Sequence, residues 1–250
     1  MAVKKNDSRN TKGLTQTERL TFENTEKYIE VNGINIHYHE AGEEHPDTII
    51  FLHGGGIGAS GWFNFYPNIE PFSEHFRTIL FDMPNFGRSG AVVIEENSSV
   101  FDANILSEFL KLKGIAKATL MGNSKGGGDA IAFSVLHTDQ LDLLVLMGAA
   151  TGPSIMDVMP PAGTAQLGET MRNPSRENVE KFLHLFFADD RFVTDEYIDL
   201  RWNAVQDHVK RGFRDARMKS ASVRRDFTTD LSKVSNPVLV VFGATDRFAA

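Results

Sequence analysis

Short apolar runs separated by polar or helical segments dominate the pattern of the chain. Five runs of this kind read as strands: Thr48–Leu52, Arg77–Phe81, Ala118–Met121, Leu141–Met147 and Pro237–Phe242. Apolar runs this short that lack strict alternation are typical of strands buried on both faces of a sheet. The pattern therefore predicts a mostly parallel sheet with helices between its strands.

The helical segments and one hairpin complete this pattern. Phe101 to Lys113 carries apolar residues at helical spacing, and Gly122–Gly128 is followed by a second expected helix through about His137. Near the N-terminus, two alternating runs, Lys27–Val31 and Ile34–His39, flank Asn32-Gly33. This dipeptide predicts a type I′ hairpin turn.

The segment from Gly152 to Val234 contains no strand-like run and has helical stretches near Glu177–Phe187 and Glu196–Lys210. A helical insertion of this kind predicts a lid over the carboxyl edge of the sheet. We expect a flexible N-terminal arm at residues 1–22, a core formed by residues 23–151 and 235–250, and a helical lid at residues 152–234.

Composition narrows the classes of function. The formal net charge is −7 and no basic stripe is present, which argues against nucleic-acid binding. The chain has no cysteine, which excludes disulfides, thiolate metal sites and a cysteine nucleophile. Met1 to Leu20 is polar and does not resemble a signal peptide, and no apolar run is long enough for a bilayer. We therefore expect a cytoplasmic protein with no membrane association.

A candidate nucleophile lies where a predicted strand meets a predicted helix. Gly122-Asn123-Ser124-Lys125-Gly126 matches the G-x-S-x-G pattern, in which a serine on a sharp turn needs small neighbours two residues away. The turn exposes the hydroxyl and leaves the Lys125 backbone N–H, at the start of the helix, available to an oxyanion. Alternatively, Ser124 only caps the helix. The strand before it and the helix after it favour the nucleophile.

A second glycine-rich turn supplies the expected partner. His53-Gly54-Gly55-Gly56 follows a strand, as does the loop that offers the other oxyanion N–H, which we assign to Gly55. A dinucleotide site is the alternative, because Gly56 to Gly61 also matches G-x-G-x-x-G. Pro67 opposes that reading, since it falls where the helix after such a loop should run. The two motifs together predict an α/β-hydrolase fold.

The acid of a catalytic triad is expected after the last predicted strand. Asp246 occupies that place, with ion pairing to Arg247 as the alternative role. None of the eight histidines follows Asp246, and each reads as a structural or surface residue. The expected fold therefore lacks its C-terminal strand and helix. A protein without turnover that binds a carboxylate ligand is accordingly an open alternative.

These residues resemble the meta-cleavage product hydrolases, a family of α/β-hydrolases that cleave a carbon–carbon bond in ring-opened aromatic compounds. The resemblance rests on four segments: His53 to Trp62 followed by Asn64, Gly122 to Gly127, Arg201-Trp202, and Asp246 to Phe248. It implies substrates of the 2-hydroxy-6-oxo-hexa-2,4-dienoate type, no cofactor and no metal, and a homo-oligomer, either a dimer or a tetramer.

The resemblance also implies roles for individual residues. Arg201 would bind the substrate carboxylate, with Trp202 beside it, while Asn64 and Asn123 would line the polar end and Phe186 the apolar end. Two positions depart from the family: Lys125 replaces a residue that is usually apolar, and Asn85 replaces a glycine. A general carboxylesterase of the same fold is the main alternative function.

Overall fold

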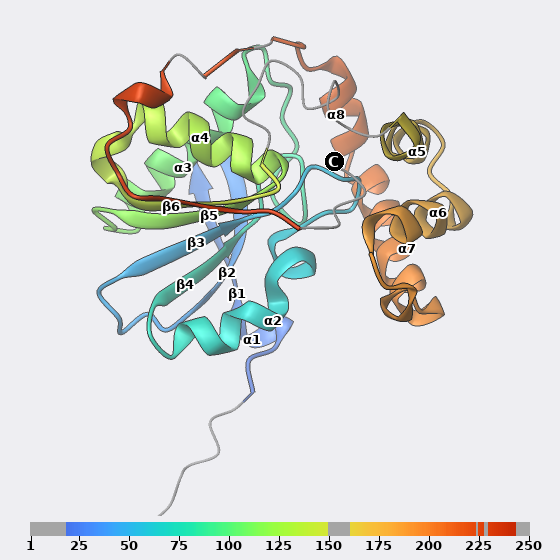
Figure 1. Ribbon diagram of the computed structural model, residues 1–250, viewed down its shortest axis with the longest axis horizontal. Helices are drawn as coiled ribbons and strands as arrows, with labels where there is room; N and C mark the ends of the chain where they lie inside the picture. The colour runs from blue at the N-terminus through green and yellow to red at the C-terminus, as the bar shows by residue number, and fades with distance from the viewer. Residues whose placement is uncertain (1–18, 150–160, 224, 228–229, 244–250) are drawn as a thin grey trace, which may run out of the picture.

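The computed structural model describes residues 19–149, 161–223, 225–227 and 230–243. They form a seven-stranded sheet with the order β1-β2-β4-β3-β5-β6-β7 (Figure 1). The strands are β1 (Glu26–Val31), β2 (Ile34–Ala41), β3 (Thr48–Leu52), β4 (Arg77–Phe81), β5 (Ala118–Asn123), β6 (Leu141–Met147) and β7 (Val238–Val241). The strands from β4 to β7 in that order run parallel, while β2 is antiparallel to both of its neighbours. The predicted mostly parallel sheet is confirmed.

The first two strands form the hairpin that the sequence predicts. Val31 pairs with Ile34, and the two turn residues have positive φ angles, 51° at Asn32 and 80° at Gly33. Two consecutive positive φ values are the signature of a type I′ turn.

Alternate residues of the central strands pack into two separate clusters. Ile50 and Leu52 of β3 point to the face covered by α3 (Ser98–Leu112) and α4 (Lys125–Leu136). Ile49 and Phe51 point to the opposite face, which is covered by α2 (Gly61–Ser73). Because β3 is buried on both faces, it has no polar side, and this explains its unbroken apolar sequence.

Helix α2 corrects the sequence interpretation. Its residues were not predicted as a helix, and Pro67 was taken as evidence against one, yet α2 contains both Pro67 and Pro71. Each proline removes one backbone N–H donor from the helix. Both prolines lie on the exposed side of α2, where water can bond the carbonyls left free. Burial of Phe65 and Ile69 against the sheet compensates for the lost hydrogen bonds.

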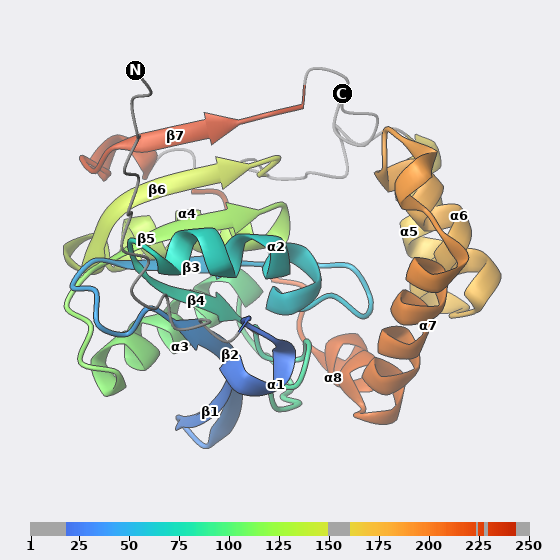
Figure 2. The same ribbon diagram turned by 90° about the horizontal axis from the view of Figure 1, so that it is seen from below.

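The segment predicted as a lid, residues 152–234, contains four α-helices among its described residues. They are α5 (Pro161–Arg172), α6 (Arg176–Phe186), α7 (Asp195–Lys210) and α8 (Phe213–Lys219). Figure 2 shows these helices beyond the carboxyl ends of the parallel strands. Helices α6 and α7 match the two predicted stretches, whereas α5 and α8 were not predicted. Val179, Phe182, Ile198 and Val205 pack with Ile57 of the core, so the lid has an apolar contact with the sheet domain.

The two ends of the described chain differ in packing. Phe22 lies inside the predicted arm, but it begins α1 (Phe22–Thr25) and packs against Trp62, so the folded part starts before residue 23. At the other end, β7 is the edge strand and its residues Val238 to Val241 are all exposed. In the described residues, no helix combines the length and apolarity needed to span a membrane.

Candidate active site

Ser124 lies in a strained backbone turn between β5 and α4. Its φ and ψ angles are 50° and −113°, a region that residues other than glycine rarely adopt. The turn is held by the Ser124 backbone N–H, which donates to the Met147 carbonyl at 2.9 Å. The Ser124 side chain accepts no capping hydrogen bond from α4, so the alternative role as a helix cap is not supported.

The glycines around Ser124 allow three backbones to approach closely. A Cβ atom at Gly122 would lie 2.3 Å from the Gly126 carbonyl oxygen, and one at Gly126 would lie 2.2 Å from the carbonyl oxygen of Leu52 in β3. Neither distance leaves room for a carbon atom. The G-x-S-x-G pattern is therefore a packing requirement of this turn.

Replacing Gly126 with alanine is expected to destabilise the protein by about 3 kcal/mol, because the new methyl group forces α4 away from β3. Urea unfolding would measure this loss. Gly168→Ala is the matched control, since the nearest atoms to its new Cβ belong to the flexible Arg172 side chain. An equal loss in both variants would contradict the packing argument.

The His53–Gly56 loop lies directly against the serine turn. A Cβ atom at Gly54 would be 3.7 Å from the Cβ of Ser124, and one at Gly55 would be 3.1 Å from the Cβ of Lys125. Within the described residues, the backbone N–H groups of Gly55 and Lys125 donate no hydrogen bond. These are the two donors predicted for an oxyanion, and the structure places both beside the serine.

The His53 ring fixes the orientation of this loop. Its Nδ1 lies 2.8 Å from the Gly54 carbonyl, and its Nε2 accepts the Met83 N–H at 3.1 Å. Both contacts are satisfied by the neutral ring with its proton on Nδ1, and burial lowers the pKa of His53 to favour that form. In a trans peptide the C=O and N–H point in opposite directions. By holding the Gly54 carbonyl, His53 therefore directs the Gly55 N–H away from itself.

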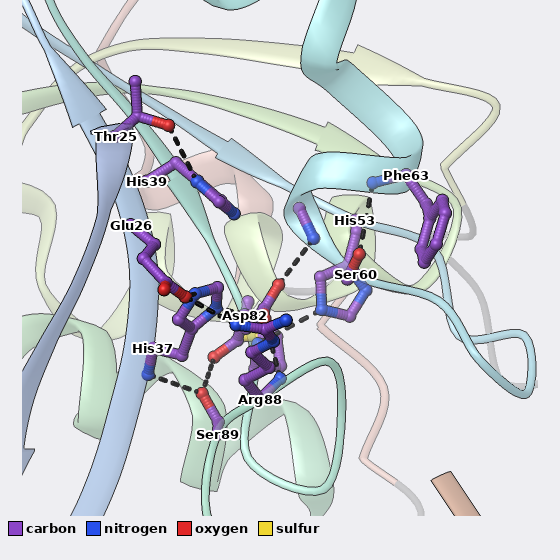
Figure 3. Close-up of polar contacts among 12 residues, drawn as sticks. Thr25, Glu26, His37, His39, His53, Ser60, Phe63, Asp82, Arg88 and Ser89 are labelled. Atoms are coloured by element: carbon purple, nitrogen blue, oxygen red, sulfur yellow. Dashed lines mark hydrogen bonds and ion pairs between the residues drawn. The ribbon is translucent and has the colours of Figure 1, made fainter. Parts of the chain in front are cut away.

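A buried hydrogen-bond network centred on Asp82 stabilises the His53–Gly56 loop. Asp82 accepts hydrogen bonds from His37 Nδ1 at 2.7 Å, from the Gly61 N–H at 2.7 Å and from the Arg88 N–H at 3.0 Å. Figure 3 shows His37, Arg88 and Ser89 grouped around this carboxylate. Although burial opposes it, the hydrogen bond from His37 keeps the pKa of Asp82 below its usual value. Residue pattern alone does not predict this network, because it joins segments far apart along the chain.

Asn85 explains one of the two departures from the family pattern. Its φ angle is 67°, in the region that glycine favours. The Asn85 side chain accepts the Val92 N–H and donates to the Val92 carbonyl, each at 2.8 Å. Asparagine is the residue that best tolerates this conformation after glycine, and here two hydrogen bonds stabilise it.

The contacts of the Lys125 side chain argue against a catalytic role on Ser124. Its Nζ contacts Asp102 of α3 at 2.5 Å and Asp129 of α4 at 2.7 Å. Burial opposes the charged form, but the two carboxylates outweigh it and raise the pKa of Lys125. A lysine held in its protonated form cannot act as a base. The contact with Asp129 could have been predicted from the sequence, because Asp129 is four residues after Lys125 in the same helix. The contact with Asp102 could not, because Asp102 lies on another helix.

Asp102 is expected to make stability depend on pH near neutrality. Burial raises the pKa of Asp102 to about 7, and the nearby Asp129 carboxylate adds to the rise. The folded state then binds a proton that the unfolded state releases, so this group's contribution to stability falls as pH rises from about 4 to about 7. The free energy of unfolding, compared with that of Asp102→Asn across this range, should show the decline. A constant difference would contradict it.

The residues predicted to bind substrate lie in two places. Asn64 Nδ2 donates to Asn123 Oδ1 at 3.5 Å, so these two amides meet beside the serine turn. Arg201 of α7 is 9% exposed, and its guanidinium carbon lies 5.2 Å from the centroid of the Phe63 ring. Trp202 packs within the lid cluster. Among described residues, no acid forms an ion pair with Arg201, and burial lowers its pKa.

The other two predicted site residues are Phe186 and Asp246. Phe186 is 48% exposed and packs against Phe182 with its ring tilted by 43°. It is Phe182 that reaches the loop, 3.9 Å from a Cβ built at Gly56. Asp246 falls outside the described residues. No group of three or more His, Asp or Glu side chains in the described part of the chain is arranged to hold a metal.

Known proteins resemble this chain over most of its length. The alpha/beta hydrolase fold family model matches residues 47–250. A 2-hydroxy-6-oxononadienedioate/2-hydroxy-6-oxononatrienedioate hydrolase of Paraburkholderia phymatum is 35% identical over 94% of this chain and 84% of its own length. A 2-hydroxy-6-oxo-6-phenylhexa-2,4-dienoate hydrolase of Comamonas testosteroni is 35% identical over 92% of this chain and 82% of its own.

A solved structure agrees with these relatives. The meta-cleavage product hydrolase of Pseudomonas fluorescens in complex with acetates is 28% identical, with a TM-score of 0.74 over 90% of this chain and 82% of that one. The family model, the sequence relatives and this structure agree on the fold and on the hydrolase family. The chain therefore belongs to the α/β hydrolase fold family and, within it, to the meta-cleavage product hydrolases.

Proposed function

We propose that this protein hydrolyses a carbon–carbon bond in 2-hydroxy-6-oxo-hexa-2,4-dienoate-type products of aromatic ring cleavage, with Ser124 as the nucleophile. The observation that carries the proposal is the strained Ser124 turn packed against the Gly55 loop, since the backbone N–H groups of Gly55 and Lys125 have no partner among the described residues. A hydroxyl next to two such donors suits attack on a carbonyl, because the donors stabilise the developing oxyanion.

The reaction would proceed through a covalent intermediate. After the dienol tautomerises to its keto form, Ser124 Oγ attacks the ketone carbon and the carbonyl oxygen becomes an oxyanion facing Gly55 and Lys125. The oxyanion then collapses to an ester and the carbon–carbon bond breaks. Its electron pair passes to the dienoate fragment, which takes up the proton that the Ser124 hydroxyl lost in the attack. Water hydrolyses the remaining ester on Ser124. Asp246 is proposed as the acid of the triad, as its place after β7 suggests.

The surroundings of Arg201 favour a substrate that carries a carboxylate. A buried guanidinium with no acid beside it in the described chain is costly, and a planar carboxylate of a ligand would satisfy it. Asn64 and Asn123 would bind the polar end of the substrate next to Ser124. Trp202 and Phe186 are proposed on the lid side, where Phe182 lies between Phe186 and the loop.

The direct test follows the fall in absorbance as the protein consumes a dienoate. The protein is used at the length it has in its source organism. Turnover of a dienoate much faster than of p-nitrophenyl acetate is expected. The reverse preference would favour the general carboxylesterase. A fluorophosphonate probe that reacts with Ser124 while neither compound is turned over would favour a ligand-binding role.

The assembly and location of the protein are separate proposals. A homo-oligomer, dimer or tetramer, follows from the family resemblance, and light scattering would decide it. A small carboxylate would be the only partner the reaction needs, with no cofactor. We propose a cytoplasmic location, which cell fractionation would test.

A further inference from the structure

Arg217 of α8 is a half-buried cation that the proposed reaction does not use. Its Nη2 donates to the Gly55 carbonyl oxygen at 3.4 Å, and its guanidinium carbon lies 4.6 Å from the centroid of the Phe86 ring. Phe86 belongs to the loop after β4 and is buried. Arg217 therefore joins the lid to the loop that carries one of the two oxyanion donors.

The electrostatic surroundings of Arg217 link it to the other donor. Burial lowers the pKa of Arg217, and the field of the Asp102 carboxylate opposes that fall. The same Asp102 contacts the Lys125 Nζ at 2.5 Å. The Lys125 Nζ also lies 5.8 Å from the centroid of Phe86, so both cations share this ring. The Lys125 ion pairs with Asp102 and Asp129 and the Arg217 contact with Gly55 thus meet at Phe86, and together they involve both residues that carry the oxyanion donors.

The contact with Gly55 restricts the loop. His53 holds the Gly54 carbonyl and Arg217 holds the Gly55 carbonyl, so two successive peptide groups have their oxygen atoms fixed. Glycine peptides rotate with little steric cost, because no Cβ opposes the rotation. If the Gly55 carbonyl were released, rotation of its peptide would change ψ of Gly55 and φ of Gly56, and the loop could then shift at Gly55, the residue that carries the donor.

We propose that Arg217 is a positioning residue that makes the oxyanion hole depend on the lid. It touches neither the reacting atoms nor the substrate; it acts through the Gly55 carbonyl and the Asp102–Lys125 pair. The oxyanion hole is complete only while α8 lies against the His53–Gly56 loop. The inference rests on the proposed role of Ser124.

The test compares Arg217→Met with Arg217→Lys and with the control Arg211→Met, whose arginine lies on the lid surface and pairs with Asp207. Because Arg217 only positions a donor, kcat of Arg217→Met should fall by about 10- to 100-fold, somewhat less than for removal of the donor itself. KM should change by less than about 2-fold, as expected when only transition-state stabilisation is lost. The fall should be equal for a dienoate and for p-nitrophenyl acetate, with partial recovery in Arg217→Lys.

A second readout does not need turnover. Amide resonances of Gly55 and Gly56 should shift in Arg217→Met and remain in place in Arg211→Met, when measured well below the unfolding temperature. Unchanged amide resonances, or a rise in KM with kcat retained, would overturn the inference. If the parent protein has no turnover but the resonances shift as expected, the proposed function fails and the positioning role stands.

Discussion

Ser124→Ala is expected to lower turnover of a dienoate by at least about 10⁴-fold, because the variant loses the only proposed nucleophile while keeping the oxyanion donors. The residual rate should come from those donors and from substrate binding. Dienoate loss followed by absorbance would measure the effect. Substrate binding should persist, since alanine is smaller than serine and leaves the neighbouring asparagines in place.

Two companion variants separate chemistry from structure. Ser134→Ala removes a hydroxyl from the same helix that bonds only the Ile131 carbonyl, and it should retain turnover. Ser124→Gly should also be inactive but more stable by about 1 kcal/mol, because glycine adopts positive φ without strain. Wild-type turnover in Ser124→Ala would exclude the proposed mechanism.

The sequence was sufficient for the sheet because the central strands have one simple pattern. Thr48–Leu52 is apolar throughout since both of its faces are buried, and the observed strand has the same bounds. The Ser124 turn could also be predicted, because the glycine spacing is a short sequence motif, although Gly126 is required by contact with the distant Leu52 of β3. Elements whose burial and backbone strain are local can be predicted from residue pattern alone.

Other parts of the site depend on contacts that no local pattern reveals. Helix α2 was missed because prolines lower helix propensity, while its stability comes from packing of Phe65 and Ile69 on the sheet. The lysine beside the nucleophile looked like a possible electrostatic aid, but Asp102, 23 residues earlier in the chain, contacts its Nζ. Arg217 lies 162 residues after the glycine it contacts. Tertiary contacts between distant segments decide these roles.

Arg201→Met is expected to change activity and stability in opposite directions. Loss of a charge-assisted contact to the substrate carboxylate should lower kcat/KM for a dienoate by about 100-fold, which corresponds to roughly 3 kcal/mol. The same variant removes a buried cation that no described acid neutralises. Its free energy of unfolding should therefore rise by about 1 kcal/mol, as when a buried ion is replaced by an apolar side chain of similar size.

Three comparisons test whether the opposite changes in activity and stability arise from binding of the substrate carboxylate by Arg201. Turnover of p-nitrophenyl acetate, which has no carboxylate, should be nearly unchanged in Arg201→Met. Arg191→Met should alter neither activity nor stability, because Arg191 is an exposed lid residue paired with Asp189. Arg201→Lys should recover part of the dienoate activity, since it restores the charge without the planar two-pronged geometry of arginine. A variant that loses both activity and stability would show that Arg201 supports the lid by packing on Phe63, and the carboxylate would then need another cation.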